Sequence, residues 1–180
     1  MMRIDLFRRT ADYNAWMNAK VYDAAATLSP EQIAQERGAF FGSILGTLNH
    51  IVVGDTIWMQ RFAGLGLGRA LEPLAAIEAP RTLRDLVFPD LDGLRGRREA
   101  LDAMITAWIG ELGESDLDGV LAYRRINGEA ERKPLAPLLL HFFNHQTHHR
   151  GQASTLLMQA GVDIGVTDLL VRIANVEPEP

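Results

Sequence analysis

The sequence predicts an all-α protein, a four-helix bundle with a small β-hairpin before its last long helix. Apolar residues recur every three or four positions over several long segments, and Gly and Pro gather between those segments. One short region instead shows two extended runs around an Asn-Gly pair. The chain has 180 residues, of which 47% are hydrophobic, so it is large enough for one full core. We therefore expect a single domain over residues 1–180.

The first two predicted helices occupy the N-terminal part of the chain. Helical spacing of apolar residues runs from Arg3 to Leu28, where Ser29-Pro30 supplies a stop. A glycine-bounded loop follows, and a second apolar stripe covers Phe41 to Phe62. Both segments are long enough to cross a bundle.

The third predicted helix begins near Thr82, a favourable N-cap residue, and runs to about Leu112. The segment before it is rich in Gly and Pro. Both residues disfavour a continuing helix, so this segment is predicted to be a long connection. Pro89 and Gly96 are expected to break or kink the early part of this helix.

A hairpin and a last long helix complete the predicted bundle. Within residues 117–133, Asn127-Gly128 favours a tight turn between two short extended runs. Pro134 suits the opening of a helix that continues to about Ala160, and Gly161 suits its C-terminal cap.

Composition argues against several classes of function. The net charge of -5 gives no attraction to phosphate backbones or anionic lipid, so neither nucleic acid nor a membrane is an expected partner. The chain has no Cys, which excludes disulfides, thiolate metal sites and a cysteine nucleophile. The N-terminus lacks the apolar stretch of a signal peptide, and no run reaches membrane-spanning length. We expect a cytoplasmic protein.

Four of the five histidines fall in the last predicted helix, at positions 141, 145, 148 and 149. His145 and His149 lie one turn apart, close enough for both to reach one metal ion, and His141 and His145 share that spacing. At about 100° per residue, His149 lies inside the apolar arc of this helix and His145 at its edge, whereas His141 and His148 point toward solvent. His145 and His149 are therefore the favoured pair. His141 and His149 are about 12 Å apart along the axis, too far to meet around one ion, so a third ligand must come from another element.

His50 is the remaining histidine, and it lies on the second predicted helix. Gly46 and Gly54 lie one turn to either side, and each costs about 1 kcal/mol of helix propensity relative to Ala. Such costs indicate close approach of another helix or room for a ligand. The sequence thus predicts a divalent transition-metal site on His50, His145 and His149.

Three segments carry a family resemblance: ADYNAWMNAKVYDAA at 11–25, GAFFGSILGTLNHIVVGDTIWMQRF at 38–62 and LLLHFFNHQTHHRGQASTLLMQAG at 138–161. In these segments the chain resembles the DinB/YfiT-like family of metal-dependent enzymes, which is unrelated to the lesion-bypass DNA polymerase of similar name. The resemblance implies a four-helix bundle with a three-histidine site on His50, His145 and His149. It also implies nickel or zinc as the metal, with manganese or iron as further options, and a homodimer. The family includes transferases and isomerases that use small thiols, so the resemblance implies a low-molecular-weight thiol cofactor.

Three imidazoles on a divalent ion leave at least one coordination position open, which is the pattern of a catalytic site. We expect the ion to activate a nucleophile toward a small-molecule substrate, as in a thiol-dependent S-transferase or isomerase. Asp55 and Gln152 are predicted to orient a ligand imidazole or a bound water, and Arg150 to pair with a carboxylate of a neighbouring helix. Ordinary structural hydrogen bonds are the alternative for all three residues.

Other functions stay open at this point. Metal-dependent hydrolysis is the second enzyme class, although Gln146 stands where zinc proteases of the H-E-x-x-H type have their glutamate, and an amide cannot take up a proton. A non-catalytic protein that binds metal for stability, sensing or stress response is a third interpretation. A fourth is an interaction protein without metal.

Overall fold

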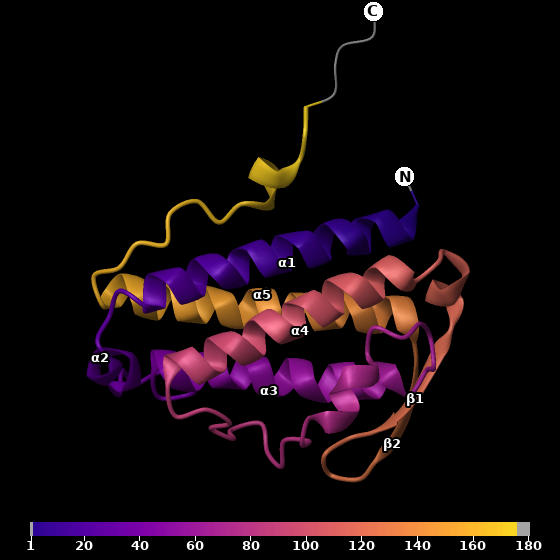
Figure 1. Ribbon diagram of the computed structural model, residues 1–180, viewed down its shortest axis with the longest axis horizontal. Helices are drawn as coiled ribbons and strands as arrows, with labels where there is room; N and C mark the ends of the chain where they lie inside the picture. The colour runs from indigo at the N-terminus through magenta and orange to yellow at the C-terminus, as the bar shows by residue number, and fades with distance from the viewer. Residues whose placement is uncertain (1, 176–180) are drawn as a thin grey trace, which may run out of the picture.

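The computed structural model describes residues 2–175. Long helices α1 (Arg3–Ala25), α3 (Ile44–Ala63), α4 (Leu91–Glu111) and α5 (Leu135–Gln159) lie side by side in a bundle (Figure 1). Both α1 and α3 pack against α4 and α5. The predicted helical bundle is confirmed. None of the helices within residues 2–175 is long and apolar enough to cross a membrane.

Short elements connect the long helices. They are α2 (Pro30–Ala34), the 3-10 helices η1 (Glu72–Ala76), η2 (Ser115–Asp118) and η3 (Leu169–Arg172), and the strands β1 (Val120–Arg124) and β2 (Ala130–Pro134). The two strands pair antiparallel, with Val120 opposite Pro134 and Arg124 opposite Ala130. Gly128 in the turn has a φ of 88°, which only glycine adopts readily. The predicted hairpin is confirmed, and it lies at the end of the bundle where α5 begins (Figure 1).

The predicted start of the third helix near Thr82 is wrong. Helix α4 begins nine residues later, where the carboxylate of Asp90 accepts a hydrogen bond of 2.8 Å from the Gly93 N–H. Thr82 lies instead in a turn closed by Asp85, whose carboxylate accepts from the Thr82 hydroxyl at 2.6 Å and from the Thr82 N–H at 3.1 Å. Thr82 and Asp85 are three residues apart, as in a helix cap, but no helix follows this turn directly. Pro89, which has no N–H, stands directly before the true cap.

The predicted loop after the first helix also contains a short helix that the sequence did not reveal. Ser29 caps α2, because its hydroxyl accepts from the Gln32 N–H at 3.3 Å while the Gln32 side chain accepts from the Ser29 N–H at 2.9 Å. Ser29-Pro30 therefore opens this helix rather than only ending α1.

The bundle core is mainly apolar, with Phe62, Trp108 and Phe142 fully buried, but it also contains a buried polar layer. The members of this layer are Asn14 and Asn18 of α1, Asp55 of α3, Arg98 and Asp102 of α4, and Arg150 of α5. Arg98 pairs with Asp55 and, at 3.0 Å, with Asp102. Asn18 donates to Asp102 at 2.9 Å. The layer thus joins the four long helices across the core.

Arg150 does not pair with a carboxylate as predicted. Its guanidinium donates to the side-chain oxygens of Asn14 and, at 3.3 Å, of Asn18. The two asparagines in turn donate to Asp102. The side-chain amides of Asn14 and Asn18 therefore lie between Arg150 and Asp102. Apolar periodicity does not predict that amides bridge the two charged groups.

Candidate metal centre

The three histidines singled out from the sequence converge on one point. His50 comes from α3, and His145 and His149 come from α5. The Nε2 atom of His50 lies 3.3 Å from that of His145 and 3.1 Å from that of His149. One ligand atom from each residue lies within 4.8 Å of the others, so the group could hold a metal ion. Within residues 2–175, His141 and His148 do not belong to such a group.

Glycines in α3 make room for this arrangement. A Cβ atom at Gly54 would lie 2.7 Å from Cε1 of His145, so any larger residue would displace the ring. At Gly46, a Cβ atom would clash with the carbonyl oxygen of Phe41 in the preceding loop. The predicted close approach of another helix is therefore found at Gly54, whereas the neighbour of Gly46 is a loop. One glycine admits a histidine ring, and the other admits the loop backbone.

Hydrogen bonds at Nδ1 orient two of the rings. The Nδ1–H of His50 donates to the carbonyl oxygen of Leu83 at 2.8 Å, and that of His149 donates to Oε1 of Gln152 at 2.8 Å. Because a carbonyl oxygen only accepts, the proton of each neutral ring sits on Nδ1 and the lone pair sits on Nε2. Two Nε2 lone pairs that face each other at 3.1 Å repel, and a cation between them removes the repulsion. The donor set therefore fits a bound metal ion.

Burial keeps the imidazoles in the neutral form that binds metal. Burial, with repulsion from His149 and His50, lowers the pKa of His145 to about 3. Burial also lowers the pKa of His50, and the nearby Arg84 acts in the same direction. Burial lowers the pKa of His149 against the opposing hydrogen bond to Gln152. All three rings are thus free of a competing proton at neutral pH.

Two loops complete the surroundings of His50 with residues that were not predicted from the sequence. The ring of Phe41 stacks on His50, with centroids 3.8 Å apart and planes at 16°, and meets His149 edge-on at 5.6 Å. The guanidinium of Arg84 lies 5.8 Å from the Phe41 centroid. Leu83 contributes a backbone carbonyl. The glycines that bracket Phe40-Phe41 were the one available signal in the sequence, because they mark a tightly turned loop.

Asp55 lies apart from the imidazoles. Its carboxylate is fully buried and is turned to Arg98 in the polar layer. Burial raises the pKa of Asp55, whereas Arg98 and Gln146 lower it. Gln152 alone of the two predicted orienting residues contacts a histidine of the group.

His145 borders an open cleft of about 830 Å³. Its walls come from α3, α5, the loop at 81–84 and the hairpin turn at 125–127. His141 also lines the cleft, with its ring 5.2 Å from Trp58 in edge-to-face contact. Trp58 forms part of the wall and does not close the site. A small molecule in the cleft can therefore contact His145.

Comparison with known proteins adds a family to this geometry. The DinB family matches residues 2–179. The chain belongs to the DinB family. A relative of this DinB-family chain is Protein DinB of Bacillus subtilis (strain 168), which is 26% identical over 157 residues, or 87% of each chain. No solved structure matches the chain. The family resemblance found in the sequence is thereby confirmed.

Proposed function

We propose that this DinB-family protein is a metal-dependent enzyme that holds one divalent ion on His50, His145 and His149 and acts on a small molecule in the adjoining cleft. The observation that carries the proposal is the convergence of three Nε2 atoms in a group of which one member, His145, lines an open cleft. A closed structural site would use four protein ligands, whereas three leave room for a reacting group.

The side chains around the site have defined tasks in this proposal. Leu83 and Gln152 hold the Nδ1 protons of His50 and His149, which aims both Nε2 lone pairs at the same point. Phe41 covers one face of the His50 ring and excludes water there. When bound, the ion supplies Lewis acidity, which favours deprotonation of a weakly acidic nucleophile or polarisation of a carbonyl group.

The reaction we favour is transfer or isomerisation with a low-molecular-weight thiol as nucleophile. The resemblance to the DinB/YfiT-like family supports this choice, and the chain has no Cys of its own, so the thiol must arrive as a separate molecule. Imidazole ligands suit nickel and zinc, which we propose first, and also iron; manganese is the remaining option.

Metal-dependent hydrolysis is the second candidate, because the same open position suits an attacking water. Gln146 cannot serve as its base, since the side chain is fully buried and carries an amide. A metal site that only stabilises the fold or serves a stress response does not account for the open cleft that His145 lines. Measured turnover separates these functions.

Metal analysis of protein purified without a His-tag tests the site. We expect about one divalent ion per chain, and we expect His50→Ala to lose it because two imidazoles on one helix bind far more weakly than three. His148→Ala is the matched control, since His148 is exposed and lies outside the group. Unchanged metal content in His50→Ala contradicts the assignment of His50.

Activity is tested with protein reconstituted with Ni²⁺, Zn²⁺, Mn²⁺ or Fe²⁺ and assayed against a panel of small thiols and electrophilic substrates. Thiol consumption that requires both the metal and His50 supports the transferase or isomerase. Hydrolysis without thiol supports the second candidate. The single-domain organisation, the homodimer and the cytoplasmic location stay predictions, and sedimentation of the purified protein tests the homodimer.

A further inference from the structure

The cleft beside His145 is strongly basic, although the whole chain is acidic. Its lining includes four arginines, at positions 61, 81, 84 and 125, and two histidines. No Asp or Glu is among the described residues that line it. The chain as a whole has a net charge of -5, so this local excess of positive charge is a specific feature of the cleft.

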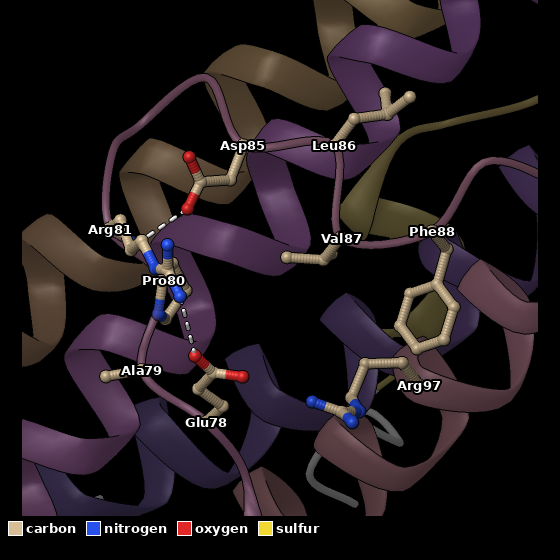
Figure 2. A pocket seen from close by; sticks show the side chains of 9 residues that line it. All are labelled: Glu78, Ala79, Pro80, Arg81, Asp85, Leu86, Val87, Phe88 and Arg97. Carbon is tan, nitrogen blue, oxygen red and sulfur yellow. Dashed lines mark hydrogen bonds and ion pairs between the residues drawn. The ribbon is translucent and has the colours of Figure 1, made fainter.

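Two of these arginines already have acidic partners. Arg125 pairs with Glu129 at 3.2 Å and with Glu131 at 3.1 Å. Figure 2 shows the loop of Arg81 from a neighbouring hollow of about 470 Å³, with Arg81 joined to Glu78 at 3.5 Å and its backbone N–H joined to Asp85 at 2.6 Å. The charges of Arg81 and Arg125 are therefore partly neutralised within the protein.

Arg61 and Arg84 have no acidic partner in the described part of the chain, yet both are held in place. The guanidinium of Arg61 lies 4.7 Å from the ring centroids of both Trp58 and Tyr123 and donates to the backbone carbonyl of Arg124 at 3.2 Å. A guanidinium has five N–H donors, so most of those on Arg61 stay available. Stacking on aromatic faces fixes the group before any ligand arrives, which lowers the entropic cost of binding.

Arg84 is the second arginine without an acidic partner among residues 2–175, and it lies near the ring that stacks on His50. Its guanidinium lies 4.7 Å from the centroid of Phe40 and 5.8 Å from that of Phe41, the ring that stacks on His50. Arg61 and Arg84 both line the cleft, and an anion bound there would neutralise their charges.

We propose that Arg61 and Arg84 form an anion subsite, which binds the carboxylate or phosphate of a small molecule whose apolar body lies against Ile57, Trp58 and Ile126. These apolar side chains line the same cleft as the two arginines and His145. Planar guanidinium groups match both kinds of anion with paired hydrogen bonds. The role of the bound molecule as substrate rests on the proposed function, whereas its binding requires only the cleft.

Calorimetric titration with three matched probes tests the subsite. Phenylacetate, phenyl phosphate and phenylacetamide share an aromatic body and differ in charge, and each is titrated into the full chain both with metal and after chelation. We expect at least one anion to bind about tenfold or more tightly than the amide, because a hydrogen bond to a charged group exceeds one to a neutral group by about this factor. The preferred anion distinguishes a carboxylate from a phosphate ligand.

Variants then assign the effect to the two arginines. Arg61→Gln and Arg84→Gln are each expected to weaken binding of the preferred anion about tenfold and to leave binding of the amide unchanged. Arg132→Gln is the control, because Arg132 is exposed on β2 outside the cleft and the net charge changes equally. Arg61→Lys and Arg84→Lys keep the charge without the planar fork, and melting curves show that each variant is folded.

Several results overturn the inference: no binding of either anion at millimolar concentration, equal affinity for the amide, or an equal loss in Arg132→Gln. Failure of the proposed function is recognised separately. Protein that binds no metal but binds the anions through Arg61 and Arg84 contradicts the metal enzyme and supports the subsite. If variants without these arginines still bind metal and turn over substrate with unchanged affinity, the metal enzyme is supported and the subsite is contradicted.

Discussion

Each imidazole of the candidate metal centre is positioned in a different way. His50 is oriented by the backbone carbonyl of Leu83, and His149 by the side chain of Gln152 one turn further along its own helix. His145 has no hydrogen-bond partner at Nδ1 within the described residues and is placed by the space above Gly54. The three rings therefore respond to different single substitutions.

Gly54→Ala is expected to weaken metal binding without unfolding the protein. The added methyl would lie 2.7 Å from Cε1 of His145, and the ring must turn away from the other two. We expect metal affinity to fall by about tenfold or more, the scale of a disturbed ligand environment, as measured by competition with a chelator.

Gly96→Ala is the matched control for this variant. A Cβ atom at Gly96 in α4 would meet nothing within 4 Å, so the metal affinity should stay the same. Helix propensity alone should raise the free energy of unfolding by roughly 0.5–1 kcal/mol. Unchanged metal affinity in Gly54→Ala would show that His145 is not a ligand or that the ring has room to spare.

Gln152→Ala removes the acceptor of the His149 Nδ1–H. Loss of such an outer partner lowers metal affinity by about 10–100-fold in other sites, and we expect a decrease in this range. Gln152→Glu keeps an acceptor at the same position and should retain most of the affinity. Equal losses in the two variants would indicate that Gln152 matters for packing rather than for its acceptor oxygen.

Among the elements, helices with an uninterrupted apolar stripe were predictable, and their connections were not. The stripes of α1, α3 and α5 repeat over many turns, so tertiary packing and local preference agree there. Thr82 and Asp85 stand three residues apart like a cap, but their hydrogen bonds close an isolated turn, and the true cap is Asp90. Spacing alone does not distinguish a cap from such a turn.

Asp90→Ala is therefore expected to destabilise α4, and Thr82→Ala is not. Loss of the Asp90 cap should lower the free energy of unfolding by about 1 kcal/mol, measured by urea denaturation. Thr82 is exposed in a loop, and its replacement should change stability by less than about 0.5 kcal/mol. A larger effect at Thr82 would mean that the loop, rather than the helix start, limits stability.

In the candidate site, too, some residues were predictable from the sequence and others were not. His145 and His149 were accessible because helical spacing puts them on one face, and His50 because no other histidine remained. The role of the Leu83 carbonyl was not predictable, because every residue has a backbone carbonyl oxygen whatever its side chain. Asp55 shows the converse limit: its place on α3 was predictable, but its partner Arg98 depends on which helix packs beside it.

On the scale of the whole molecule, the buried polar layer ties all four long helices together. Two arginines and two carboxylates lie inside the bundle, and each guanidinium bridges to a different helix. Such a layer adds less stability than apolar packing but makes other arrangements of the helices costly, because they would leave a buried charge without a partner.

Arg98→Met should therefore be strongly destabilising. It leaves Asp55 and Asp102 without their counter-charge, and we expect the free energy of unfolding to fall by about 3–5 kcal/mol. Adding Asp55→Asn should recover part of the loss. Arg132→Met, on an exposed strand, should change stability by less than about 0.5 kcal/mol. A mild effect of Arg98→Met would show that water or a rearrangement of the core compensates for the lost counter-charge of Asp55 and Asp102.

The acceptor that orients His50 belongs to the main chain, and this makes the ring insensitive to the identity of residue 83. A side-chain exchange at that position preserves the carbonyl and therefore the tautomer of His50. Insertions and deletions between residues 78 and 88 are different, because they reroute the loop and withdraw the oxygen. The orientation of His50 thus depends on the length of this loop rather than on the side chain at position 83.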